Sequence, residues 1–212
     1  MRPVLFDCDG VLVDSEALSC EATADLLTVR GFDLDGAEVM RRFLGRSIAA
    51  VYAHCAALGR PLDPGFADEK ERLYVERARG VLQPIPGAHA VVERLAGRAP
   101  IAVATSGSPA KVAFSLRETG LARHFDVVVC AVEVARGKPA PDLFLLAADR
   151  LGVDPRTCLV VEDAVPGIEA ARAAGMFAVG LSSSLSRDTL RAAGADVVLD
   201  RLDQLLDLPE LG

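Results

Sequence analysis

Two acidic residues stand two positions apart at the end of a short apolar run near the start of the chain. The run Val-Leu-Phe at 4–6 is followed by Asp7, Cys8 and Asp9. In an extended chain residues i and i+2 share a face, so this spacing lets both carboxylates address one ligand while Cys8 points away and packs. Asp is also an ordinary turn residue, so the pair by itself fits either a catalytic site or a solvated turn.

Other polar residues follow later apolar runs in the same way. Thr105 and Ser106 end one run, Glu162 and Asp163 end another, and Lys138 stands in the segment GKPAPD before a predicted helix. In open α/β sheets, ligands bind at the carboxyl ends of the strands. The sequence therefore predicts that four acids, a hydroxyl and an amine meet at one edge of one sheet.

The charges of this set indicate what it binds. Four carboxylates within several ångströms of one another do not all stay ionised without compensating positive charge, and Lys138 supplies only one. A divalent cation supplies the remainder, and an all-oxygen set without His or Cys favours Mg²⁺ over zinc or copper. Because Mg²⁺ keeps positions for water and substrate phosphate, the expected ligand is a phosphoryl group.

The elements that must position these residues alternate along the chain. Six apolar runs rich in β-branched residues are predicted as strands, at 4–6, 101–104, 127–129, 159–161, 178–181 and 197–199. Helical patterns lie between them at 110–118, 142–151 and 167–174, each followed by a glycine suited to a C-cap. This alternation predicts an α/β fold with a right-handed parallel sheet covered by helices on both faces.

The segment between the first two strands has a different pattern. Residues 15–84 contain only helical patterns, at 16–30, 36–44, 48–58 and 66–79. A crossover between parallel strands needs a single helix, so this length is too great for a simple connection. We therefore predict a core domain of residues 1–14 and 85–212, with a small helical domain of residues 15–84 inserted after the first strand.

The composition argues against several classes of protein. Hydrophobic residues make up 51% and charged residues 25% of the 212, as in an ordinary soluble globular protein. The net charge of −7 disfavours nucleic acid or an anionic membrane as a partner. With no apolar run near the roughly 20 residues of a membrane helix and no secretion signal, a cytoplasmic location is predicted. The five scattered cysteines indicate neither a zinc site nor a disulfide framework.

Four stretches together resemble the motifs of the haloacid dehalogenase superfamily. They are DCDGVLVD at 7–14, the strand end at Thr105, GKPAPD around Lys138, and VVEDAVPGIEAA at 160–171. They occur in the family's order and span nearly the whole chain, and the helical insertion resembles the small cap of the β-phosphoglucomutase-like branch. The resemblance implies a Rossmann-like core with a helical cap, and an Mg²⁺-dependent phosphatase acting on a small phosphomonoester such as a sugar phosphate or a phosphorylated sugar acid.

The resemblance also implies roles for the acidic residues. Asp7 resembles the nucleophile that forms an aspartyl-phosphate, and Asp9 resembles the general acid and base. The family's Mg²⁺ would be held by the carboxylates of Asp7 and Asp163 and the backbone carbonyl of Asp9. Glu162 is expected to act on the metal from outside its ligand shell or through water.

Substrate binding is expected to be divided between the two domains. Thr105 and Lys138 would bind the phosphoryl oxygens, with help from the backbone around Ser106. Substrate choice would lie in the inserted domain, where Arg46 stands out because Gly45 beside it permits close approach, and a guanidinium binds a carboxylate or second phosphate bidentately. The expected partner is a small phosphorylated molecule, and the expected assembly is a monomer or small homo-oligomer.

Alternative activities fit the residues less well. Dehalogenases need no acid two positions after the nucleophile, where this chain has Asp9. Mutases of the β-phosphoglucomutase branch carry a His in the first cap helix, where this chain has Ser19, so a phosphosugar mutase is the second interpretation. A phosphonatase needs a cap lysine, and only Lys70 is available. A catalytically silent binding module is a more remote interpretation, because such a module is expected to have lost part of this set.

Overall fold

The protein, described by a computed structural model at residues 1–43 and 46–212, divides into two compact units. One unit comprises Met1–Asp14 and Gln83–Gly212, and the other comprises Ser15–Leu82. The helical unit thus ends at Leu82, whereas the sequence placed the boundary at residue 84. Within the first unit, its two chain segments meet where the backbone N–H of Asp14 donates to the carbonyl of Gln83, at 2.9 Å.

The first unit is built on a six-stranded sheet in the order β3-β2-β1-β4-β5-β6, and every neighbouring pair is parallel. The strands are β1 (Val4–Phe6), β2 (Ile101–Thr105), β3 (Val127–Cys130), β4 (Leu159–Glu162), β5 (Phe177–Leu181) and β6 (Val197–Leu199). The predicted parallel sheet is confirmed. Because the strand order reverses at β1, between β2 and β4, the carboxyl end of β1 is the place where such a sheet binds ligands.

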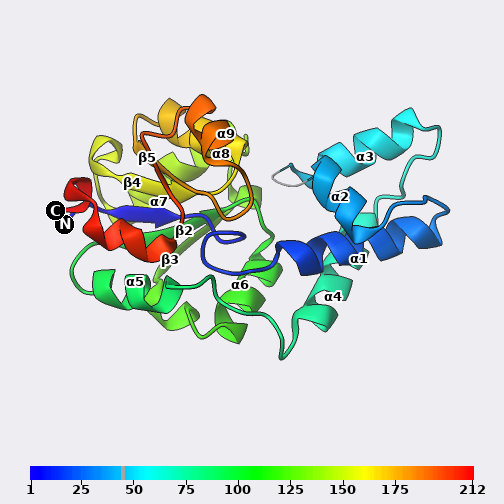
Figure 1. The fold of residues 1–212 in the computed structure, drawn as a ribbon, viewed down its shortest axis with the longest axis horizontal. Coiled ribbons are helices and arrows are strands. Elements are labelled where there is room, and N and C mark those ends of the chain that lie inside the picture. Colours follow the sequence, from blue (N-terminus) through cyan, green and yellow to red (C-terminus); the bar gives the residue numbers. More distant parts are fainter. Residues whose placement is uncertain (44–45) are drawn as a thin grey trace. The chain divides into compact units, whose positions relative to one another are not determined.

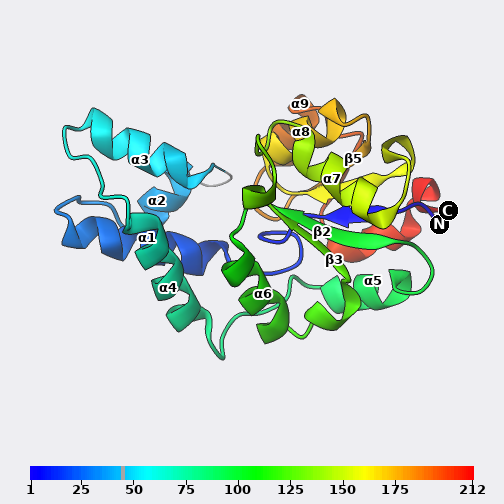
Figure 2. The same cartoon turned by 180° about the vertical axis from the view of Figure 1, so that it is seen from behind.

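Helices cover both faces of this sheet (Figures 1 and 2). They are α5 (Ala88–Leu95), α6 (Pro109–Glu118), α7 (Asp142–Leu151), α8 (Val165–Ala173) and α9 (Arg187–Ala192). Short 3₁₀ turns connect or follow them: η1 (Ala122–His124), η2 (Ala131–Glu133), η3 (Pro155–Thr157), η4 (Leu202–Asp207) and η5 (Pro209–Leu211).

The alternation of side chains along β1 divides the core into two layers. Val4 and Phe6 pack with α5, α6 and η4, whereas Leu5 packs on the other face with α7 and α8. All three side chains are fully buried, which explains why the strand is apolar throughout. A strand buried on both faces is rigid, and it holds the polar residues that follow it in a fixed place.

Two of the helices were not among the predicted elements. In α5 the buried Val91, Val92 and Leu95 nevertheless recur at helical spacing. Helix α9 has only six residues and buries only Leu190, so it offers little periodicity to detect.

The second unit is helical. It contains α1 (Glu16–Val29), α2 (Gly36–Phe43), α3 (Ile48–Ala57) and α4 (Phe66–Ala78). Its own buried cluster includes Leu27, Phe32, Val51 and Phe66. The prediction that α2 extends to Leu44 falls outside the described residues. In residues 1–43 and 46–212, no helix is both long enough and apolar enough to cross a membrane.

Candidate active site

Asp7 directly follows β1, and the sheet fixes its backbone. Its N–H donates to the carbonyl of Val161 on β4 at 3.0 Å, and the residue is only 7% exposed. Asp9, two positions on, is half-buried. Cys8 between them is buried in the apolar layer that contains Phe6, so the prediction that it packs is confirmed. Burial raises the pKa of the Cys8 thiol well above its ordinary value, which keeps it protonated and unreactive.

Lys138 joins two of the predicted acids in one buried cluster. Its Nζ lies 2.6 Å from Asp7 Oδ1 and 2.6 Å from Glu162 Oε1. The three side chains are 6%, 10% and 2% exposed, in the order Lys138, Asp7, Glu162. Removing each ion of a buried pair from water costs roughly several kcal/mol. Such a pair is therefore favourable only when its contacts are as close as these.

The pKa values reflect this burial. Burial raises the pKa of Asp7 to about 7; the ammonium of Lys138 opposes this rise, while the neighbouring carboxylates of Glu162 and Asp9 add to it. Burial alone lowers the pKa of Lys138, but the charges of Asp7 and Glu162 outweigh it and the net pKa is raised. Lys138 therefore stays charged. Its single positive charge does not neutralise the combined negative charge of Asp7 and the neighbouring carboxylates.

Glu162 is held entirely by protein donors. Its Oε1 accepts from Lys138, and its Oε2 accepts the backbone N–H groups of Asp163 and Ala164 at 2.9 and 3.0 Å. A Cβ on Gly167 would lie 1.8 Å from Oε1, so only glycine leaves room for this carboxylate. Both carboxylate oxygens of Glu162 are thus engaged by protein donors, and its carboxylate anchors Lys138, which fits the expectation that Glu162 acts on a metal from outside the ligand shell.

Asp163 lies against the loop that carries Asp9. A Cβ built on Gly10, whose φ is +75°, would lie 2.1 Å from Asp163 Oδ2. That same oxygen accepts a hydrogen bond from Ser184 Oγ at 2.8 Å. Ser183 Oγ donates to the carbonyl of Gly10 at 2.7 Å, so the loop after β5 supports both the Gly10 turn and Asp163.

The described residues fit Mg²⁺ better than a transition metal. In residues 1–43 and 46–212, no three His, Cys, Asp or Glu side chains converge as a metal-binding group. The predicted direct ligands are two carboxylates, Asp7 and Asp163, and the backbone carbonyl of Asp9, with Glu162 outside the ligand shell. Mg²⁺ is ordinarily bound through one or two carboxylates, with water and substrate oxygens completing its shell, so the donor set and its excess negative charge suit this ion.

Thr105 is the last residue of β2, and Ser106 follows it beside the loop that carries Asp9. Thr105 is 1% exposed, and its Oγ1 accepts the N–H of Gly107 at 3.2 Å. A Cβ on Gly107 would lie 3.6 Å from that oxygen and 3.8 Å from Asp9 Oδ2, which places Thr105 and Asp9 around one glycine. Ser106 is exposed.

Arg46 belongs to the helical unit and is exposed. Gly45, on which the prediction for Arg46 depended, lies outside the described residues. The structure therefore groups the core residues of the predicted site, whereas the part assigned to Arg46 stays a prediction.

Sequence reasoning missed three residues of this cluster. Lys111 Nζ lies 2.7 Å from each carboxylate oxygen of Asp9, although 102 residues separate the two. Ser183 and Ser184 follow β5, and the rule that polar residues gather at the carboxyl ends of strands already pointed to them. Lys111 stands in a helix, six residues after Thr105, where that rule gives no signal.

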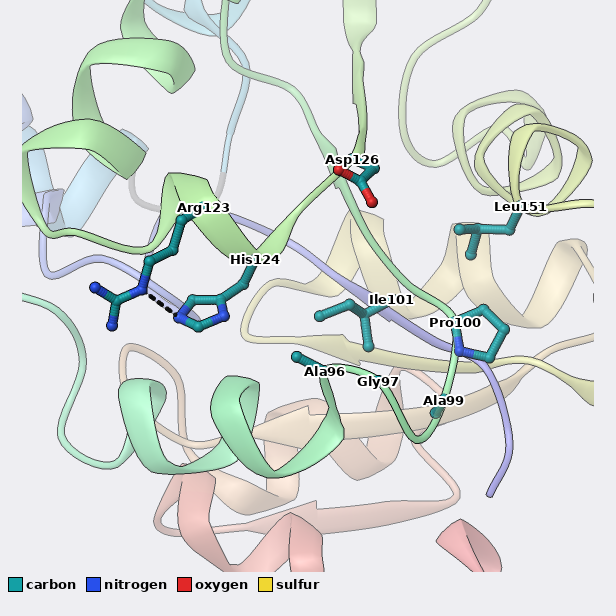
Figure 3. A pocket seen from close by; sticks show the side chains of 9 residues that line it. All are labelled: Ala96, Gly97, Ala99, Pro100, Ile101, Arg123, His124, Asp126 and Leu151. Atoms are coloured by element: carbon teal, nitrogen blue, oxygen red, sulfur yellow. Dashed lines mark hydrogen bonds between the residues drawn. The ribbon is translucent and has the colours of Figure 1, made fainter.

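We call Asp7, Asp9, Glu162 and Asp163 the acid cluster. A cavity elsewhere in this unit lies apart from it (Figure 3). It has a volume of about 320 Å³ and lies at the amino end of β2, where its lining includes Pro100 and Ile101. Arg123 and His124 line its polar side, and Arg123 Nε donates to His124 Nε2 at 3.0 Å. The carboxylates lie at the opposite ends of the strands.

The model of haloacid dehalogenase-like hydrolases matches residues 1–175 of the sequence. The chain belongs to this family. This membership confirms the resemblance predicted from the four motifs, and it agrees with the position of the acid cluster at the carboxyl end of β1.

Related proteins match most of the chain. Fructose-1-phosphate phosphatase YqaB of Escherichia coli is 38% identical over 178 residues, which are 83% of this chain and 94% of that protein. Protein SUPPRESSOR OF QUENCHING 1 of Arabidopsis thaliana is 34% identical over 209 residues; these cover 95% of this chain but only 20% of the plant protein. A solved hydrolase from Deinococcus radiodurans, with bound phosphate and sodium, is 33% identical, with a TM-score of 0.77 and coverage of 97% and 93%.

Proposed function

We propose that this protein is an Mg²⁺-dependent phosphatase that hydrolyses a small phosphomonoester through an aspartyl-phosphate on Asp7. The observation that carries the proposal is the buried cluster in which Lys138 holds Asp7 and Glu162, with Asp9 two residues from Asp7. The fructose-1-phosphate phosphatase among the relatives and the phosphate bound to the Deinococcus hydrolase support it.

Asp7 is the nucleophile of the first step. One of its carboxylate oxygens attacks phosphorus, the bond from phosphorus to the ester oxygen breaks, and an acyl phosphate forms on Asp7. Lys138, bonded to Oδ1, holds the carboxylate in one orientation, which lowers the entropic cost of reaching the transition state. Buried Asp7 has little water around it, so little solvent must be displaced before the attack.

Asp9 carries the proton in both steps. As an acid it gives a proton to the departing ester oxygen, and as a base it then takes a proton from the water that attacks the acyl phosphate. That attack breaks the bond between phosphorus and Asp7, releases phosphate and restores both acids. A positioned acid or base of this kind is typically worth about 10²- to 10⁴-fold in rate.

The remaining core residues bind the phosphoryl group and the metal. Mg²⁺ would be held by the carboxylates of Asp7 and Asp163 and by the carbonyl of Asp9, and when bound it supplies positive charge to the phosphoryl oxygens. Thr105 and Lys138 donate hydrogen bonds to the same oxygens, with the exposed Ser106 beside them. Glu162 acts through Lys138, whose ammonium it fixes.

The helical unit Ser15–Leu82 selects the substrate in this proposal, as a cap would. The core binds only the phosphate, so recognition of the rest of the molecule needs other residues. Exposed Arg46 is suited to a second anionic group of the substrate. A sugar phosphate or phosphorylated sugar acid is the proposed substrate class, and the fructose-1-phosphate phosphatase supports the former.

The protein's other proposed properties follow from its sequence and charge. The partner is a small phosphorylated molecule rather than nucleic acid or a membrane, in keeping with the net charge of −7. The five cysteines are all free, which supports a reducing compartment such as the cytoplasm. The assembly is proposed to be a monomer or small homo-oligomer.

The deciding experiment measures phosphate release from a panel of esters. The panel contains fructose 1-phosphate, glucose 6-phosphate, a hexitol phosphate, a phosphorylated sugar acid and p-nitrophenyl phosphate, each with Mg²⁺ or with a chelator. We expect Mg²⁺-dependent release from at least one sugar phosphate and from p-nitrophenyl phosphate. Tight binding without release would instead support the silent module, and conversion of one sugar phosphate into its isomer would support the mutase.

The Asp7→Asn variant tests the covalent step. Because an amide is a poor nucleophile and breaks the ion pair with Lys138, we expect the rate to fall by at least about 10³-fold, a loss of the size found when nucleophiles are removed from other enzymes. Mass spectrometry of acid-quenched wild-type enzyme should detect the acyl phosphate on Asp7. A variant that keeps the full rate would rule out this mechanism while leaving the hydrolase activity itself intact.

A further inference from the structure

Lys111 makes a symmetrical contact with Asp9 inside the same unit. Its Nζ lies 2.7 Å from both Oδ1 and Oδ2, and the two side chains are 12% and 27% exposed, lysine first. Each carboxylate oxygen has two acceptor sites, so Lys111 occupies only part of the acceptor capacity of Asp9. The contact therefore fixes the plane of the carboxylate without using up its capacity to exchange a proton.

The place of Lys111 in its helix is electrostatically unfavourable. Ser108 is the N-cap of α6, and its Oγ accepts the N–H of Lys111, which is the third residue of the helix. A cation in the first turn opposes the helix dipole. A long side chain also loses rotamer freedom when it is ordered. The nearby carboxylate of Asp9 gives a reason for a lysine at this position.

The two lysines are divided between the two acids of the proposed reaction. Lys138 contacts Asp7 and Glu162, whereas Lys111 contacts Asp9. The contacts come from different elements, since Lys138 precedes α7 and Lys111 lies in the first turn of α6. The nucleophile Asp7 and the proton carrier Asp9 are thus each held by a lysine from a different element.

We propose that Lys111 is a positioning residue that holds the carboxylate of Asp9 for proton transfer to the leaving group. This inference rests on the proposed phosphatase function. When the ester bond breaks, the proton of Asp9 passes to the ester oxygen, and the carboxylate that remains stays bonded to Lys111. Lys111 itself exchanges no proton and makes no bond to phosphorus. Holding the Asp9 carboxylate in one orientation lowers the entropic cost of the proton transfer, as Lys138 does for the attack by Asp7.

The test compares two esters that differ in their need for an acid. An alkyl leaving group, as in a sugar phosphate, departs only with a proton, whereas p-nitrophenolate departs without one. For Lys111→Met we expect kcat/KM to fall about tenfold or more with the fastest sugar phosphate of the panel, and less than about threefold with p-nitrophenyl phosphate, because only the former needs the acid. The inhibition constant of inorganic phosphate should stay unchanged.

Two variants serve as controls. Arg117→Met removes a cation from the exposed last turn of the same helix and should leave both kcat/KM values unchanged. Lys111→Arg keeps the positive charge and should recover part of the loss for the sugar phosphate. Near-ultraviolet circular dichroism and thermal unfolding monitor folding; if Lys111→Met does not fold, Lys111→Gln and Lys111→Arg carry the same comparison.

Three outcomes overturn the inference. An equal loss for both esters would mean that Lys111 has a merely structural role. A higher inhibition constant for phosphate, with a higher KM for both esters, would mean that Lys111 binds the phosphoryl group. No loss with either ester would mean that Asp9 needs no such support. If the wild-type enzyme hydrolyses neither ester, the proposed function itself fails, which is distinct from all three.

Discussion

At the scale of single residues, Gly10 shows how closely the acid cluster is packed. Its φ of +75° is costly for a side chain, and an added Cβ would lie 2.1 Å from Asp163 Oδ2. For Gly10→Ala we expect a loss of about 1–2 kcal/mol in the free energy of unfolding from the backbone alone. Displacement of the Asp163 carboxylate should weaken Mg²⁺ binding in addition. Urea unfolding and a magnesium titration of activity measure the two effects.

Gly152→Ala is the matched control for this variant. Gly152 has a similar φ of +68°, but a Cβ there would meet nothing within 4 Å. It should therefore show a comparable loss of stability with unchanged magnesium dependence. If both variants titrate with magnesium like the wild type, the packing of Gly10 against Asp163 has no bearing on the metal.

The sequence predicted the residues at strand ends and in motifs better than the contacts among them. Asp7, Asp163 and Lys138 were found because each stands at a strand end or a motif, where position along the chain determines position in space. Lys111 was missed because the contact depends on a lysine side chain that reaches from α6, and helical periodicity says nothing about where a polar side chain ends. The anchoring of Lys138 by Glu162 was likewise beyond the sequence, since it depends on the space left by a glycine.

At the scale of elements, the start of α6 positions Lys111. The Oγ of Ser108 accepts the N–H of Lys111 at 3.2 Å and so fixes the first turn. Ser108→Ala should lower the free energy of unfolding by about 1 kcal/mol, the usual value of an N-cap. It should also lower kcat/KM for a sugar phosphate more than for p-nitrophenyl phosphate, because the turn that carries Lys111 frays. Steady-state kinetics with both esters test this.

Ser108→Thr separates capping from other effects of the substitution. Threonine also accepts the N–H of the third helical residue, so this variant should keep most of the stability and the wild-type ratio of the two kcat/KM values. A normal ratio in Ser108→Ala, despite the lost stability, would show that the cap stabilises the helix without positioning Lys111.

Elements with a continuous apolar pattern were predicted to within a residue or two. Strand β1 and helix α7 have the predicted bounds, and β4 extends one residue further, to Glu162. Helix α6 begins at Pro109 rather than 110, because proline lacks the N–H that the first turn leaves unpaired anyway. Helix α5 was overlooked because it follows a proline and a glycine, residues that indicate a linker as readily as a helix start.

At the scale of the whole molecule, negative charge is concentrated where a cation is expected. The chain carries a net charge of −7, and in the core unit Asp7 and Glu162 pair with Lys138 and Asp9 pairs with Lys111, while Asp163 lies against Gly10. Uncompensated buried charge weakens the folded state, so a bound cation stabilises it beyond any part in catalysis. A measurement of folding stability therefore tests for metal binding even when the substrate is unknown.

We therefore expect Mg²⁺ to raise the melting temperature of the protein. A ligand that binds only the folded state stabilises it by RT ln(1 + [L]/Kd), or about 2.7 kcal/mol at a concentration one hundred times Kd. Scanning calorimetry with increasing MgCl₂, against NaCl of equal ionic strength, measures this shift apart from screening. Asp163→Asn should lose most of the shift because the amide carries no charge, whereas Asp142→Asn removes a carboxylate paired with Arg136 at the surface and should keep it. Equal shifts in both variants would place the ion elsewhere in the molecule.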